Sequence, residues 1–157
     1  LFTAIIASSV INIFKDTIEE VIFLAVLMPI IASMGGVAAT QTLTITVRGL
    51  ALGQIMSSNY FYLLSREITV GLVNGFFWAL VLGFISYFWF NEITIALIIL
   101  LSMIINLFMA VISGMGIPLM LKFFKLDPAI AGSVIVTTIT DVVGFLSFLG
   151  LSTVFYS

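Results

Sequence analysis

The 157-residue sequence contains no cysteine and no histidine, and only 8% of its residues are charged. Without cysteine the chain has no disulfides, no thiolate nucleophile and no cysteine-based metal site. Without histidine it lacks the commonest catalytic base and the commonest transition-metal ligand. The net charge of −2 and the lack of a basic run argue against binding to nucleic acid. Any bound cation must be held by oxygen atoms, which suit hard ions such as Mg²⁺, Ca²⁺ and Mn²⁺.

Apolar residues make up 62% of the chain, whereas soluble domains carry about 25% charged residues and fewer apolar ones. We therefore predict an all-α polytopic membrane protein forming a single domain over residues 1–157. The first apolar segment spans only about 21 Å as a helix, so we expect residues that precede it in a longer polypeptide to complete the span. The five predicted transmembrane helices cover roughly residues 1–14, 21–47, 70–90, 93–121 and 129–156.

The polar breaks between these segments differ in charge. With five spans, four of the five basic residues fall on the side of the N-terminus. The positive-inside rule makes that side cytoplasmic and places the C-terminus outside, in a multi-pass protein of the inner (plasma) membrane. An acidic loop on the opposite side is either a solvated loop or a feature that concentrates cations. The four basic residues are Arg48, Arg66, Lys122 and Lys125, and the acidic loop contains Asp16, Glu19 and Glu20.

Asp141 is the only charged residue in the apolar run 129–156. An ionised carboxylate at the bilayer centre costs about 2.5–3.5 kcal/mol on insertion scales, and such residues usually face a bundle interior or a wet pathway. Polar and small residues share its side of the helix. This stripe consists of Ser133, Thr137, Thr140, Asp141 and Gly144. The pattern predicts an ion pathway with Asp141 as the metal ligand; the alternative is a structural aspartate bonded to threonines between helices.

The second apolar segment is interrupted by Pro29 and by the pair Gly35 and Gly36. Proline kinks a helix, and glycine allows close backbone approach. We predict that Gly35, Gly36 and Gln41 line a pore or cavity. Four threonines in the same stretch suit either helix packing or the pathway. They are Thr40, Thr42, Thr44 and Thr46.

Two connections carry local signals. The stretch 49–69 is mixed in character, and Tyr60 and Tyr62 predict a short helix at the membrane interface. Asp127 followed by Pro128 predicts a helix start, with aspartate as the N-cap and proline in the first helical position.

Two groups of residues resemble a known family. The run from Met28 to Gly36, continuing through Gln41 to Ala51, is similar to the second span of the MgtE magnesium channels. The run from Leu126 to Gly144 is similar to their fifth span. The resemblance implies a homodimer with a cation pore on its two-fold axis. It also implies that the residue at the position of Asp141 faces this axis, where one carboxylate from each subunit binds a shared hydrated magnesium ion. The resemblance further implies cytoplasmic N-terminal and CBS domains that sense magnesium. These domains are not among the 157 residues, so we expect either that the chain is a piece of a longer protein or that this member does without them.

The second span departs from the family pattern G-G-N-x-G-N-Q. The two asparagine positions hold Val37 and Thr40, and the second glycine position holds Ala39. Two amide side chains are therefore missing, which leaves open whether Mg²⁺, Mn²⁺, Co²⁺ or Ca²⁺ is the transported ion.

The expected function is transport of magnesium or another divalent cation through a channel-like pore in the lipid bilayer. The alternatives are a carrier coupled to sodium or protons through Asp141, and a scaffold that does not conduct. The chain is not expected to be an enzyme, because aspartyl chemistry needs two carboxylates and Asp141 is the only one deep in a span. No serine–histidine, metalloprotease or phosphate-loop pattern is present.

Overall fold

The computed structural model describes residues 1–55 and 59–156, and within them every regular element is a helix. The prediction of an all-α fold is confirmed. The helices are α1 (Phe2–Ile13), α2 (Lys15–Glu20), α3 (Phe23–Ala51), α4 (Tyr60–Phe90), α5 (Ile93–Phe123) and α6 (Pro128–Tyr156).

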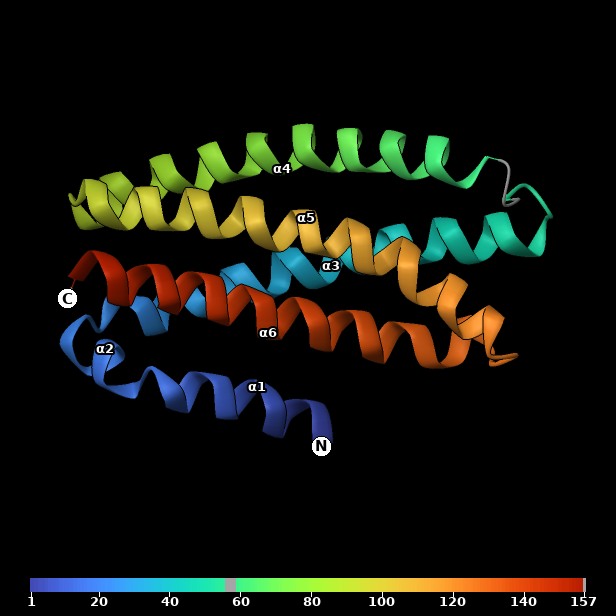
Figure 1. Ribbon diagram of the computed structural model, residues 1–157. Coiled ribbons are helices and arrows are strands. Elements are labelled where there is room, and N and C mark those ends of the chain that lie inside the picture. The colour runs from blue at the N-terminus through green and yellow to red at the C-terminus, as the bar shows by residue number, and fades with distance from the viewer. Residues whose placement is uncertain (56–58, 157) are drawn as a thin grey trace.

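Helix α5 organises the bundle. It packs against α3, α4 and α6, while α3 and α4 hardly touch each other (Figure 1). Helix α6 also packs along α3, and α1 lies against its other side. Successive long helices run in opposite directions, so α3 and α6 are antiparallel neighbours. The main core lies between α3, α5 and α6, where Ile31, Met103 and Phe148 are almost completely buried.

Four helices, α3 to α6, are long and apolar enough to cross a membrane. Many of their apolar side chains face outward, as Phe84 and Trp89 do, because lipid surrounds a membrane helix on its free sides. Helix α1 has 12 residues and a length of about 18 Å, less than the ~30 Å hydrocarbon core. Four of the five predicted segments therefore coincide with helices that could span a membrane, and a fifth span in the first segment stays a prediction.

Helix α4 begins at Tyr60, ten residues before the predicted start of the third span at residue 70. The prediction of a separate interfacial helix around Tyr60 and Tyr62 was wrong, because both residues lie in the first turn of α4. Arg66 and Glu67 end the apolar run, but they do not end the helix. Near a membrane surface, backbone groups are still best satisfied inside a helix. The predicted connector also includes residues 56–58, which lie outside the described residues.

The start of α6 confirms the predicted cap. Pro128 is the first helical residue, and the Ala129 amide donates a hydrogen bond of 2.8 Å to Asp127 Oδ1. At the opposite end of the bundle, Asn91 ends α4 in a left-handed conformation with φ of 53°. Asparagine tolerates this conformation better than most residues, which allows the two-residue turn between α4 and α5.

Candidate functional site

Asp141 lies midway along α6 and is partly exposed on the surface of the subunit. Its carboxylate has no hydrogen-bond or ion-pair partner among the residues that the structure describes. The alternative of an aspartate bonded to threonines within one chain therefore has no support. The nearby threonines bond to their own helix instead: the Thr137 hydroxyl donates to the Ser133 carbonyl at 2.9 Å.

Three polar residues of α6 follow one another at intervals of four, namely Ser133, Thr137 and Asp141. This spacing puts them on one side of the helix, one turn apart. Ser133 is exposed, while Thr137 and Asp141 are partly exposed. Because the Thr137 hydroxyl donates its proton to the backbone, its oxygen is left to accept hydrogen bonds from water.

A matching stripe runs along α3, again at intervals of four residues. The Thr40 hydroxyl donates to the Gly36 carbonyl at 2.9 Å, and the Thr44 hydroxyl donates to the Thr40 carbonyl at 2.7 Å. The hydroxyl protons of Thr40 and Thr44 therefore point to backbone carbonyls of α3, as the Thr137 proton points to a backbone carbonyl of α6. The hydroxyl oxygens are left to accept hydrogen bonds from water. The stripe consists of Gly36, Thr40, Thr44 and Arg48.

The two stripes face each other across a groove. A Cβ atom added to Gly36 would lie 4.0 Å from Thr137 Cγ2, which places the two residues side by side. Further along, a hollow of about 400 Å³ separates the helices. It is lined by Thr40, Leu43, Thr44, Val47, Arg48, Ala51, Ala129 and Ser133. We call the surface formed by this hollow and the continuing stripe of Gly36, Thr137 and Asp141 the α3–α6 groove.

The chemistry of the groove suits a hydrated cation. Its polar groups are the Asp141 carboxylate, several hydroxyl oxygens and, in the hollow near the end of α3, the exposed guanidinium of Arg48, with apolar side chains between them. In the described part of the chain no three Asp, Glu, His or Cys residues gather at a point where they could hold a metal ion. A single carboxylate does not replace the water shell of a divalent ion, so the ion would be held through its waters or by a second chain.

The residues predicted to line the pathway fall into two sets. Gly36, Ser133, Thr137 and Asp141 lie along the α3–α6 groove. The other set, Gly35, Thr140 and Gly144, is buried between helices of the same subunit.

Asn106 of α5 is the centre of that buried set. The side chain is fully buried, and its Nδ2 atom donates a hydrogen bond of 2.9 Å to the Ile31 carbonyl of α3. The Asn106 amide lies so close to Gly35 and Gly144 that a Cβ atom at either glycine would overlap it. Small residues that let backbones approach closely are typical of helix contacts in membranes.

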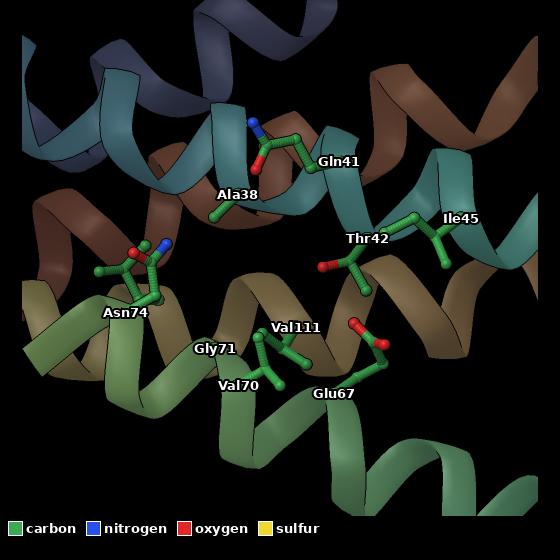
Figure 2. Close-up of a pocket in the computed structure, with 10 residues that line it drawn as sticks. Ala38, Gln41, Thr42, Ile45, Glu67, Val70, Gly71, Asn74 and Val111 are labelled. Carbon is green, nitrogen blue, oxygen red and sulfur yellow. The ribbon is translucent and has the colours of Figure 1, made fainter.

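Gln41, the remaining predicted residue, lies neither in the α3–α6 groove nor in the buried set. It is exposed and lines a separate cavity between α3 and α4, together with Thr42 and Asn74 (Figure 2). The α3 stripe was not predicted, although its spacing of four residues is readable in the sequence. No pattern in the sequence pointed to the contact of Asn106 with two glycines, because it depends on how three helices meet.

Sequence comparison with known proteins identifies the family of the chain. The family model MgtE, described as a divalent cation transporter, matches residues 28–151, which include all of α4 and α5 and most of α3 and α6. The chain belongs to the MgtE family. It is 30% identical to the magnesium transporter MgtE of Bacillus subtilis and 28% identical to that of Enterococcus faecalis, each over 99% of the chain. It is 26% identical to the magnesium transporter MgtE of Thermus thermophilus over 97% of the chain.

The chain spans about a third of the length of these relatives, 34% in each case. The match therefore identifies this chain with one part of an MgtE protein. That part contains the four long apolar helices and the α3–α6 groove.

Proposed function

We propose that this chain is the membrane-spanning domain of a magnesium transporter and that Mg²⁺ crosses the bilayer along the α3–α6 groove. One observation carries the proposal: Asp141 has a carboxylate without a partner, midway along an apolar helix and on the groove side. An intramembrane carboxylate is costly, so a charge that is not paired within the subunit indicates a partner from outside it. The similarity of the chain to magnesium transporters favours a divalent cation as that partner.

A homodimer completes the site. In an open groove, one partly exposed carboxylate is a weak ligand for a divalent ion, whereas two carboxylates facing each other across a two-fold axis provide a balancing charge. Two such carboxylates without an ion would share a proton, and the double charge of the ion keeps both ionised. Monovalent ions offset this repulsion less well, which favours divalent ions. In the dimer, the grooves of two chains face each other and form the pore.

The ion keeps its water in this pore. Mg²⁺ sheds water reluctantly and prefers octahedral coordination by oxygen at about 2.0–2.1 Å. The hydroxyl oxygens of Ser133, Thr137 and Thr40 accept hydrogen bonds from the water shell. The family resemblance implies amides at the positions of Val37 and Thr40, and this chain lacks both. We therefore expect Mn²⁺ and Co²⁺, which also form hydrated octahedral ions, to pass as well.

The orientation follows from the charges at the two ends of the bundle. Arg48 and Lys122 lie near the ends of α3 and α5, and the connections after these helices are at the same end (Figure 1). By the positive-inside rule, this end faces the cytoplasm and the C-terminus lies outside. We propose that α1 is part of a fifth span, completed by residues preceding Leu1.

Reconstitution tests the function. Purified protein is placed in liposomes that contain a magnesium-sensitive dye, and external Mg²⁺ is added. We expect saturable influx that requires neither a sodium gradient nor a proton gradient, and single-channel currents in planar bilayers. Influx that depends on a co-ion would favour a carrier. Influx no greater than in protein-free liposomes would contradict transport. It would instead favour the alternative of a scaffold that does not conduct ions.

A further inference from the structure

A cavity lies between α3 and α4, on the side of α3 that faces away from the α3–α6 groove. These two helices pack on α5 rather than on each other, which leaves a space of about 140 Å³ between them (Figure 2). The walls contain four polar side chains among apolar ones. The polar residues are Gln41, Thr42, Glu67 and Asn74.

Thr42 is oriented differently from the other threonines of α3. The hydroxyls of Thr40, Thr44 and Thr46 each donate to a carbonyl of their own helix, whereas the Thr42 hydroxyl makes no hydrogen bond with any described residue. Its side chain is 93% buried, with an exposure of 7%. Figure 2 shows the Thr42 side chain directed from α3 into the space between α3 and α4. Among the described residues, the fully buried side-chain atom without a partner is Asn106 Oδ1, so the Thr42 hydroxyl is open to the cavity that it lines. It is therefore available to bind a water or a ligand there.

Glu67 supplies a charge opposite this hydroxyl. It lies about 10 Å from the start of α4 and is partly buried. Figure 2 shows its carboxylate directed from α4 toward α3, on the side of Thr42. No lysine or arginine lines the cavity, and the described residues offer the Glu67 carboxylate no ion-pair partner. The net charge of the cavity wall is therefore −1.

The size and composition of the cavity select the class of ligand. A volume of 140 Å³ holds about four or five water molecules, at about 30 Å³ each. One carboxylate with hydroxyl and amide oxygens around it suits a hard cation. Mg²⁺ in proteins usually keeps several waters and is bound through one or two carboxylates.

We propose that the cavity between α3 and α4 is a second divalent-cation site, in which Glu67 binds the ion and the Thr42 hydroxyl, Gln41 and Asn74 bind its waters. This site is separate from Asp141, and it does not rest on the proposed pathway. An ion in this position bridges two helices that otherwise lack direct packing. Its binding therefore stabilises the arrangement of α3, whose other side forms the α3–α6 groove.

The test is a titration of the purified full chain with Mn²⁺, followed by the electron paramagnetic resonance signal of the free ion. The Asp141→Asn background removes the proposed pathway site. In this background we expect about one Mn²⁺ per chain, displaced by Mg²⁺ and much less by Na⁺. Adding Glu67→Gln removes the only charged ligand, and we expect affinity to fall at least about tenfold. Thr42→Val, which keeps the shape of the side chain, weakens binding to a smaller extent.

Two matched controls accompany these variants. Glu20→Gln removes an exposed carboxylate at the other end of the bundle, and Thr46→Val removes a hydroxyl of α3 that is bonded to the Thr42 carbonyl. Both are expected to keep the Mn²⁺ affinity of the background. Unchanged affinity in Glu67→Gln would overturn the proposal, as would equal displacement by Na⁺ and Mg²⁺. If Glu67→Gln fails to fold, the comparison of Thr42→Val with Thr46→Val decides. A site that persists in Asp141→Asn yet vanishes in Glu67→Gln supports this cavity whatever the role of Asp141.

Discussion

Replacing Gly35 by alanine tests the contact at the centre of the bundle. An added methyl group would overlap the Asn106 amide nitrogen and lie 2.8 Å from Asn106 Cγ. The side chain has no room to retreat, because it is fully buried and a methyl group on Gly144 would also lie 2.8 Å from the same nitrogen. The Asn106 amide must therefore leave its hydrogen bond to the Ile31 carbonyl.

The expected cost combines three effects. Overpacking a well-packed core costs about 1–3 kcal/mol. The lost hydrogen bond between membrane helices adds about 0.6 kcal/mol. Alanine offsets up to about 1 kcal/mol of this, because it favours the helix more than glycine does. The net loss is about 1–3 kcal/mol, and a loss of 2 kcal/mol lowers the midpoint of thermal unfolding by about 4–8 °C for a chain of this size.

The assay is thermal unfolding of the purified protein in detergent. Gly36→Ala is the matched control: it changes the adjacent residue of the same helix, where the nearest atom to a new methyl group is 4.0 Å away. We expect its midpoint to stay the same or rise slightly. In Gly35→Ala, adding Asn106→Ala removes the clash, so the double variant should lose less stability than the sum of the single ones. Equal midpoints for Gly35→Ala and Gly36→Ala would refute the packing argument.

Three further predictions use single substitutions. Asp127→Ala removes the N-cap of α6 and should cost about 0.5–2 kcal/mol in thermal unfolding, while Asp127→Asn should keep most of the stability. Tyr156→Phe removes the 2.8 Å hydrogen bond that the hydroxyl donates to Glu92 and should cost about 0.5–1.5 kcal/mol; an unchanged midpoint would show that water replaces this bond. Because the chain has no cysteine, a thiol reagent should block Mg²⁺ flux in Ser133→Cys on the groove and leave it intact in Val134→Cys, which is exposed beside it. Block in both variants would contradict the groove as the pathway.

The sequence was sufficient for the main features of the fold. The four long apolar segments correspond to α3 to α6, and the predicted N-cap at Asp127 is confirmed. Both features depend on residues that are near one another in the chain, which is why the sequence predicts them. The start of α4 was missed because hydropathy reports which residues suit lipid, while the helix continues into the polar stretch around Glu67.

The site was predictable only in part. The side of α6 that carries Asp141 was identified from spacing, and Ser133 and Thr137 lie on the groove with it. The predicted stripe was wide enough to cross the boundary between groove and core, so Thr140 and Gly144 are buried instead. Which half of a polar stripe faces inward depends on the packing of neighbouring helices, and a single sequence does not contain that information.

The measurement that tests the central claim most directly is Mg²⁺ influx into liposomes by Asp141→Asn. This change removes one negative charge and keeps the size of the side chain. Asp16→Asn, in an exposed position of α2, is the control and should transport Mg²⁺ like the unmodified protein. The account predicts that Asp141→Asn folds with an unchanged unfolding midpoint or a higher one, because a costly charge is gone, and that its Mg²⁺ influx falls to the level of protein-free liposomes. Influx equal to that of the unmodified protein would contradict the account, since Mg²⁺ would then cross without the Asp141 carboxylate.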